Sequence, residues 1–172
     1  MRAATVDEEQ AILAFFEGME TGLAPRVIGR HALAVVERDG IPFAVLVTPE
    51  ALNLPEGLRG DAASAGLVIG TIEDGFHLDI QGAVLVARHT KSQTIRLTEH
   101  AARLFLYGRN VLGDSIIWAD RTLARGDACI VCNGRGEAMG LGTVVGNLKG
   151  PREAVKPIHD LGTYLRDQDE GT

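Results

Sequence analysis

The sequence lacks a long hydrophobic run and an excess of positive charge. No uncharged apolar segment approaches the ~18 residues that a membrane-spanning helix needs, and the N-terminal "MRAATVDEEQAILAFF" has acids where a secretory signal has a basic start. The formal net charge of −6 at pH 7 argues against indiscriminate binding of nucleic acid or anionic membranes, because both attract a protein through summed positive charge. We therefore expect a soluble, intracellular protein without a membrane partner.

Cysteine is nearly absent. The two that occur, Cys129 and Cys132 in "GDACIVCNG", have the C-x-x-C spacing of redox and zinc sites. No second cysteine pair exists to complete a zinc site, and the flanking residues are typical of a buried strand that ends in an Asn-Gly turn. Residues three apart on a strand point to opposite faces and lie ~10 Å apart, too far for a disulfide. We predict structural thiols and no metal site.

Recognisable catalytic motifs are also missing. The histidines are scattered without metal-ligand spacing, no serine lies in a G-x-S-x-G turn, and "GLGTVVG" (residues 140–146) lacks the third glycine and following helix of a dinucleotide fingerprint. The best acid-base pair is His77 and Asp79 in "GFHLDI", where the two residues alternate with apolar ones as on the solvent face of a half-buried strand. We predict no catalytic residue, no cofactor and no enzymatic activity.

Charge is distributed unevenly along the chain. Residues 1–92 contain 7 Lys/Arg and 13 Asp/Glu, whereas residues 93–172 contain 10 of each. Three of the acids in the second part lie in the final six residues, which leaves 10 basic against 7 acidic residues in the rest of it. A polyanionic partner would therefore bind the C-terminal half.

The first ninety residues indicate a mixed α/β unit. "DEEQAILAFFEG" (residues 7–18) has acids in its first turn, an apolar stripe and a closing glycine, as an amphipathic helix does. Apolar runs at 27–36 and 41–47 flank the turn "ERDG" and predict a hairpin, and runs at 66–72 and 76–86 flank the turn "EDG". We expect a mostly antiparallel sheet.

A polar stretch, "ARHTKSQT" (residues 87–94), separates this unit from a second one. Thr98 can cap a helix that stops at Gly108. Short strand-like runs follow at 115–118, 128–132 and 137–145 and suggest a small barrel, and the last six residues suggest a disordered tail. The sequence thus predicts an α+β fold with an N-terminal domain at 1–92 and a C-terminal domain at 93–172.

Four cations gather near the end of the chain, in "GNLKGPREAVKPIHD". Arg152 and Lys156 are four residues apart, so they share a face of a helix or of a regular strand. Pro157 disfavours a long helix, and we expect an extended segment. Lys149 in the preceding glycine-rich loop and His159 at the start of the "DLGTYL" turn could converge on the same edge. Spacing alone leaves open whether the cluster binds a partner or is a solvated surface.

Three ordered motifs in the second half resemble a known module. "FLYGRNVL" (105–112), "ARGDACIVCNGRGEAMGLG" (124–142) and "HDLGTYLRD" (159–167) resemble the PUA domain, an RNA-binding β pseudo-barrel. Joined to an α/β domain that contains "IGTIEDGFHLDIQG" (69–82), they resemble the Nip-seven family of large-subunit ribosome biogenesis factors in its archaeal form. The resemblance covers nearly the whole chain, strongly from residue 105 onward and weakly over the first sixty residues.

The resemblance implies that the two domains bind different partners. The N-terminal pre-PUA domain would bind ribosome assembly proteins, RNA exosome components among them, and the PUA domain would bind pre-ribosomal RNA. Lys149, Arg152 and Lys156 would contact phosphates, with His159 as a pH-dependent helper. The chain departs from related archaeal proteins at Glu153 and His159, where further basic residues can occur. The protein would act in the cytoplasm, or in the nucleolus if the source is eukaryotic.

The RNA itself is expected to be single-stranded or looped, uridine-rich strands included, because the deep major groove of an A-form duplex hides its bases from side chains. Two other functions remain open at this point. One is an RNA-modification enzyme, or its accessory subunit, since PUA modules are often fused to such enzymes. The other is a translation factor that carries a PUA module.

Overall fold

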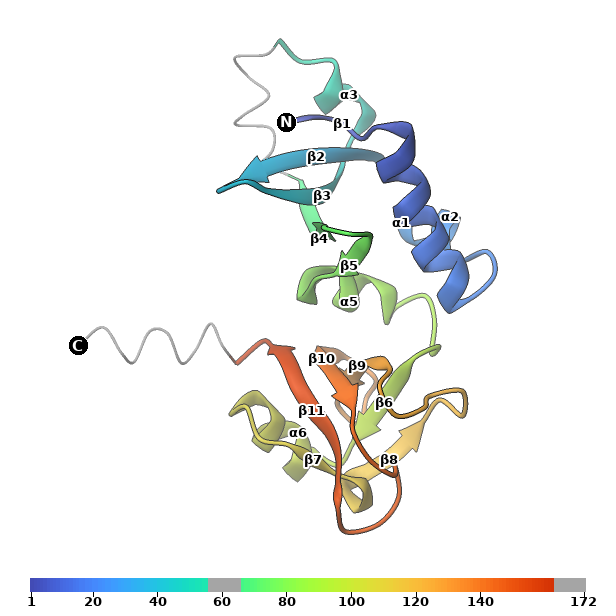
Figure 1. Ribbon diagram of the computed structural model, residues 1–172, viewed down its shortest axis with the longest axis vertical. Coiled ribbons are helices and arrows are strands. Elements are labelled where there is room, and N and C mark those ends of the chain that lie inside the picture. The colour runs from blue at the N-terminus through green and yellow to red at the C-terminus, as the bar shows by residue number, and fades with distance from the viewer. Residues whose placement is uncertain (56–65, 163–172) are drawn as a thin grey trace, which may run out of the picture. The chain divides into compact units, whose positions relative to one another are not determined.

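The computed structural model describes residues 1–55 and 66–162 (Figure 1). The chain divides into two compact units, Met1–His89 and Thr90–Thr172. The sequence places this boundary three residues later, after residue 92. Each unit has its own sheet, and the α+β class is confirmed. The predicted C-terminal tail lies outside the described residues.

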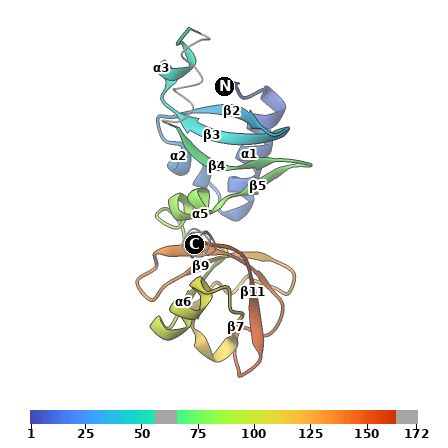
Figure 2. The same cartoon turned by 90° about the vertical axis from the view of Figure 1, so that its left-hand side faces the viewer.

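The first unit contains a five-stranded antiparallel sheet (Figures 1 and 2). Its spatial order follows the chain: β1 (Arg2–Ala3), β2 (Ala32–Arg38), β3 (Ile41–Val47), β4 (Leu67–Ile72) and β5 (Phe76–Leu78). The predicted turn between β2 and β3 has positive φ angles at Asp39 and Gly40, which suits a two-residue hairpin whose twist matches that of the strands. The mostly antiparallel sheet expected from the sequence is therefore present.

Helix α1 (Val6–Met19) is the helix predicted at 7–18. A capping box starts it: the Thr5 side chain accepts from the Glu8 N–H, and the Glu8 carboxylate accepts from the Thr5 N–H. Its buried face contributes Phe16, whose ring meets those of Phe15 and Phe76. This aromatic group links the helix to the last strand of the sheet. A short helix α3 (Pro49–Leu52) follows β3, with Thr48 as its N-cap and Pro49 in its first turn.

The sequence places the start of one strand several residues too early. The run at 27–36 was expected to be extended throughout, but helix α2 (Leu23–Ile28) includes its first residues. Leu23, Ala24 and Val27 are buried on one face of this helix, and Gly29, with φ 60°, ends it. Because α2 is only six residues long, its apolar spacing is too short to be told from that of a strand.

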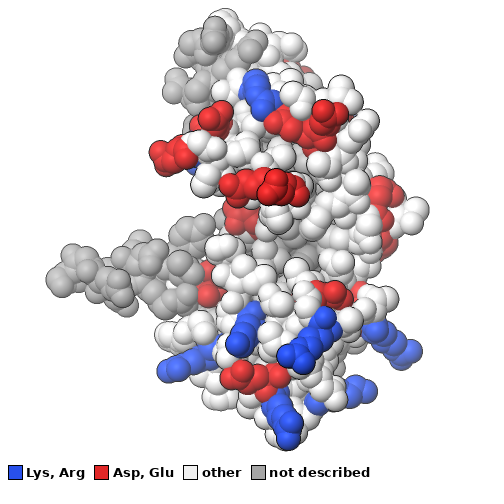
Figure 3. Space-filling view, viewed as in Figure 1, with Lys and Arg blue, Asp and Glu red and all other residues white. Residues whose placement is uncertain are grey.

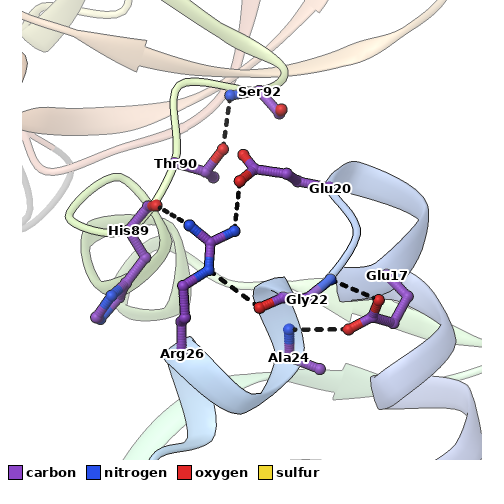
Figure 4. Close-up of polar contacts among 8 residues, drawn as sticks. All are labelled: Glu17, Glu20, Gly22, Ala24, Arg26, His89, Thr90 and Ser92. Atoms are coloured by element: carbon purple, nitrogen blue, oxygen red, sulfur yellow. Dashed lines mark hydrogen bonds and ion pairs between the residues drawn. The ribbon is translucent and has the colours of Figure 1, made fainter.

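Side chains around α2 hold its two ends (Figure 4). The Glu17 carboxylate accepts from the backbone N–H groups of Gly22 at 2.7 Å and Ala24 at 3.3 Å. Arg26 forms an ion pair with Glu20 and donates to the carbonyl oxygens of Gly22 at 3.0 Å and His89 at 2.9 Å. Within the first unit, these contacts tie α1, α2 and the last described residue of the unit together.

A second predicted strand is mostly helical. Of the run at 76–86, only β5 is extended, and α5 (Ile80–Val86) follows it. The Asp79 carboxylate caps this helix by accepting from the Ile80 N–H at 2.6 Å. His77 lies exposed on β5, with its Nε2 2.8 Å from the Glu73 carbonyl oxygen. His77 and Asp79 therefore do not share a strand face.

The second unit is a six-stranded, nearly closed pseudo-barrel (Figures 1 and 2). Its sheet order is β7-β11-β10-β9-β6-β8, antiparallel except for the β6–β9 pair. The elements are β6 (Thr94–Leu97), α6 (Glu99–Leu106), β7 (Val111–Leu112), η1 (Gly113–Ser115), β8 (Ile116–Ala119), β9 (Ala128–Cys132), β10 (Ala138–Val144) and β11 (Glu153–Asp160). The predicted helix after Thr98 and the predicted strands at 115–118, 128–132 and 137–145 correspond to α6, β8, β9 and β10.

The core of this barrel contains Phe105 of α6 against side chains of β6, β9 and β11. Gly140 of β10 allows the close approach of the last strand, because a Cβ there would lie 2.3 Å from the His159 carbonyl oxygen. No helix in residues 1–55 or 66–162 is long and apolar enough to cross a membrane.

Candidate nucleic-acid interface

The four cations predicted from the sequence lie along one element, and we name Lys149, Arg152, Lys156 and His159 the β11 cluster. Lys149 and Arg152 are in the loop that leads into β11, and Lys156 and His159 are on the strand itself. All four are exposed. Neither Lys149, Arg152 nor Lys156 forms an ion pair with any described residue, so three full charges face solvent.

The backbone of the loop is tightly held while its cationic side chains are free. The Gly113 N–H donates to the Arg152 carbonyl oxygen at 3.0 Å, and the Asp114 N–H donates to the Gly150 carbonyl oxygen at 2.7 Å. A Cβ at Gly113 would lie 2.8 Å from the Gly150 carbonyl oxygen, so only glycine permits this packing of η1 against the loop. Lys149 and Arg152 are thus presented from a fixed backbone, which lowers the entropy lost when they bind a ligand.

Two β-bulges decide which side chains of β11 point outward. Ala154 is an extra residue relative to β7, and Ile158 is an extra residue relative to β10. Ala154 and Val155 are both fully buried, whereas Lys156, Ile158 and His159 are exposed. The four-residue spacing of Arg152 and Lys156 therefore does not set their faces as in a regular strand, because the first bulge lies between them.

Glu153, at the start of β11, has a local partner. Its carboxylate accepts from Asn110 Nδ2 at 2.9 Å, across the pair formed by β7 and β11. Arg109, which precedes Asn110, is exposed. The site predicted from the sequence omits Arg109, although the charged "YGRN" loop between a helix and a strand was a signal that could have identified it.

The residues after the C-terminal end of β11 pack against the C-terminal end of α6. The Leu161 N–H donates to the Met139 carbonyl oxygen at 2.9 Å, and a Cβ at Gly162 would lie 1.9 Å from the Leu106 carbonyl oxygen. The motifs that contain "FLYG" and "HDLG" are therefore adjacent in space. Tyr107, 72% exposed, follows α6 directly and presents a ring suited to stacking on an unpaired base.

The two units differ in their balance of basic and acidic residues. Among the described residues 93–162 there are 9 Lys/Arg and 7 Asp/Glu, since Arg166, Asp167, Asp169 and Glu170 lie beyond them. Figure 3 shows Lys and Arg side chains spread over the second unit, while Asp and Glu prevail on the visible face of the first. The field that would attract a polyanion therefore comes from the second unit.

The two cysteines are buried on β9, and neither is in a disulfide. Cys129 belongs to the barrel core. Cys132 lies opposite Arg96 in the β6–β9 register and is outside that core group. Burial raises the pKa of Cys129 to about 12 and that of Cys132 to about 11, so both thiols are protonated at neutral pH. Over residues 1–55 and 66–162, no group of three or more His, Cys, Asp and Glu residues could hold a metal ion.

The comparisons with known proteins agree with this architecture. Residues 93–169 match the family described as the UPF0113 PUA domain. The chain is 39% identical over 128 residues to a UPF0113 protein of Aeropyrum pernix, an overlap that covers 68% of each chain. The small-barrel prediction is thereby confirmed as a PUA domain, while the more specific resemblance to the Nip-seven family is not shown.

Solved structures share the fold over nearly the whole chain. A conserved PUA domain protein from Thermoplasma acidophilum superposes with a TM-score of 0.62 at 13% identity, covering 97% of both chains. A hypothetical protein from Pyrococcus horikoshii superposes with a TM-score of 0.66 at 16% identity, covering 92% of this chain and 93% of its own. From the sequence match to its Aeropyrum pernix relative and the match of its second unit, we conclude that the chain belongs to the UPF0113 family of PUA-domain proteins.

Proposed function

We propose that this protein is a non-catalytic RNA-binding factor that acts in the assembly of the large ribosomal subunit. The observation that carries the proposal is the β11 cluster: three exposed cations that form no ion pair with any described residue, on a hydrogen-bonded loop and strand of a PUA domain. Exposed Lys and Arg side chains without acidic partners are what phosphate groups require. The overall charge of −6 makes this local patch, and not the whole surface, the attractive feature.

The RNA is single-stranded or looped. Ile158 lies exposed on β11 and Tyr107 lies exposed directly after α6, and unstacked bases can pack on such side chains, whereas bases in a duplex are not accessible to them. The likeness of the motifs at 69–82, 105–112 and 159–167 to the Nip-seven family supports pre-ribosomal RNA as the target and ribosome assembly proteins as partners of the first unit.

A titration tests the RNA-binding step. A labelled uridine-rich strand is titrated with the wild-type protein and with the double variant Arg152→Ala/Lys156→Ala, at two salt concentrations. The matched control is Arg30→Ala/Arg88→Ala, which removes the same charge from exposed positions in the first unit. We expect weaker binding for the first variant only. Equal affinity for wild type and both variants at both salt concentrations would mean that the β11 cluster is merely a solvated surface.

Crosslinking in cells tests the ribosomal step. RNA bound by the tagged wild-type protein is sequenced and compared with RNA bound by the double variant. We expect reads from large-subunit ribosomal RNA that decline in the variant. Enrichment of messenger or transfer RNA without large-subunit ribosomal RNA would contradict the assignment to ribosome assembly while leaving RNA binding intact.

A further inference from the structure

The outer surface where β6 and β8 pair carries the chain's single tryptophan. Ile95 and Leu97 point into the barrel core, so Arg96 between them points outward. In the β6–β8 register, Arg96 pairs with Trp118 and Leu97 pairs with Ile116, which leaves Ile117 as an extra residue in a bulge. Ile117 and Trp118 are both exposed as a result, at 57% and 38%.

The Arg96 guanidinium supports the indole from one side. Its Cζ lies 5.7 Å from the ring centroid of Trp118. The same guanidinium packs on the β9–β10 turn at Gly136, where φ is 88° and a Cβ would lie 2.9 Å from Nη2. Arg96 Nε is buried and has no hydrogen-bond partner in the described part of the chain. The guanidinium is thus held in place by packing, and it holds the ring at the surface in turn.

The charges around this ring favour an anionic strand. Arg135 is exposed in the same β9–β10 turn, between Gly134, which lies near Ile117, and Gly136, which contacts Arg96. The carboxylate of the neighbouring Glu137 accepts from Asn133 Nδ2 at 2.6 Å. Neither Arg96 nor Arg135 has an ion pair among the described residues. The carboxylate of Glu137 is therefore engaged, and so is that of Asp120, which follows β8 and accepts from the Gln93 and Thr122 N–H groups, while the two cations remain available.

We propose that Trp118, backed by Arg96, stacks on an unpaired base of single-stranded RNA, with Arg135 at a neighbouring phosphate. This inference rests on the proposed RNA-binding function and adds a second contact site to the β11 cluster. Proteins that bind single strands combine cations along the backbone with aromatic rings that carry the bases. Since every base has a flat face, a tryptophan at this position strengthens binding with little sequence preference.

The single tryptophan makes a direct test possible, since its fluorescence reports Trp118 alone. A labelled single strand is titrated with the wild-type protein while its anisotropy and the tryptophan emission are both followed. We expect the emission to be quenched as the anisotropy rises, with the same midpoint. Trp118→Ala should bind about tenfold more weakly, and Trp118→Phe should keep most of the affinity because a ring remains. Arg152→Ala/Lys156→Ala should bind weakly but still show quenching at saturating RNA.

The outcomes separate this inference from the function on which it rests. If the anisotropy rises while the emission stays constant, and Trp118→Ala binds like the wild type, base stacking is wrong and RNA binding stands. If the wild type binds no RNA in the anisotropy channel, both are wrong. Thermal melts of Trp118→Ala and Trp118→Phe show whether either variant has lost its fold. If both variants are folded, wild-type RNA affinity in Trp118→Phe together with reduced RNA affinity in Trp118→Ala supports stacking.

Discussion

In the first unit, Arg2 and Arg26 form ion pairs with Glu8 and Glu20 near the ends of helices, whereas Arg152 and Lys156 of the second unit form none with any described residue. Arg2 and Arg26 stabilise the local structure through these ion pairs. Arg152 and Lys156 lie on a loop and a strand that backbone hydrogen bonds already hold. The difference indicates that the second unit retains exposed charge for a partner, and each prediction below tests one side of this comparison.

The largest expected effect is on the free energy of unfolding, when one glycine in each unit is replaced with alanine. Gly140→Ala should destabilise the second unit by about 3 kcal/mol, because the new Cβ would lie 2.3 Å from the His159 carbonyl oxygen and neither backbone can move freely. Gly18→Ala in α1 is the matched control: nothing lies within 4 Å of its Cβ, and alanine should stabilise the helix by about 0.5–1 kcal/mol. Urea denaturation measures both, with Trp118 emission reporting the second unit. A Gly140→Ala protein as stable as the wild type would show that the β10–β11 packing is looser than described.

The next largest effect concerns how RNA affinity depends on salt concentration. With ~3 phosphate contacts and a slope of roughly −0.7 per contact for single strands, log affinity of the wild type should fall by about two units per tenfold rise in salt. Arg152→Ala/Lys156→Ala should flatten the slope to roughly −0.7 and weaken binding roughly 25-fold at 0.1 M salt, the value expected for two lost contacts. The melting temperature should hardly change, because exposed cations contribute little to stability.

The matched control for this titration is again Arg30→Ala/Arg88→Ala in the first unit, which should keep the wild-type slope. If this variant flattened the slope as much as the β11 variant, the net charge of the protein would govern binding, and the contrast between the units would disappear.

A smaller effect concerns the capping box of the first unit. The hydrogen bond from Arg2 is the main cause that lowers the pKa of Glu8 to about 2, with help from the Thr5 N–H and hydroxyl. Because the folded-state pKa lies below the ordinary value of 4.5, the stabilisation is fully present above about pH 4.5 and is lost as the pH falls toward 2. Glu8→Gln should therefore cost about 1 kcal/mol at pH 7 and close to nothing near pH 2.

Denaturation of wild type, Glu8→Gln and Glu9→Gln at pH 7 and at pH 2.5 measures this dependence. Glu9 also lies in the first turn of α1 but is exposed and has no side-chain partner in the described structure, so its variant isolates the general effect of a negative charge near the helix start. A cost for Glu8→Gln that is equal at both pH values would contradict the assignment to a titrating carboxylate.

The smallest effect is expected for the cysteines. Replacing Cys129 and Cys132 with Ala or Val should leave RNA affinity unchanged, because both side chains are buried away from the β11 cluster. In the native protein at pH 8, both should react slowly with a thiol reagent, since their raised pKa values leave little thiolate. Stoichiometric zinc in the wild type, lost in the double variant, would show that these residues bind a metal.

The sequence was most informative where an element is long or sharply bounded. Strand β9 spans Ala128–Cys132, the predicted range, because Gly126-Asp127 and Asn133-Gly134 turns flank a continuous apolar run. It failed at α2 and α5, helices of six and seven residues, because fewer than two turns of apolar spacing do not distinguish a helix from a strand. Asp79 is a typical helix N-cap, but the sequence pattern places it with His77 on the solvent face of a half-buried strand.

Composition, turn residues and Pro157 are local signals, and they suffice to predict the class of the fold, the position of the cations near the end of the chain and the extended conformation around Lys156. Which side chains face outward depends instead on how the strands pair. The bulges at Ala154, Ile158 and Ile117 arise from the pairing of strands far apart in the chain, and each changes the face of every residue that follows it. The support of Trp118 by Arg96 depends on Gly136, which lies forty residues after Arg96 in the β9–β10 turn, so it exists only because the nearly closed barrel brings β6, β8 and this turn together.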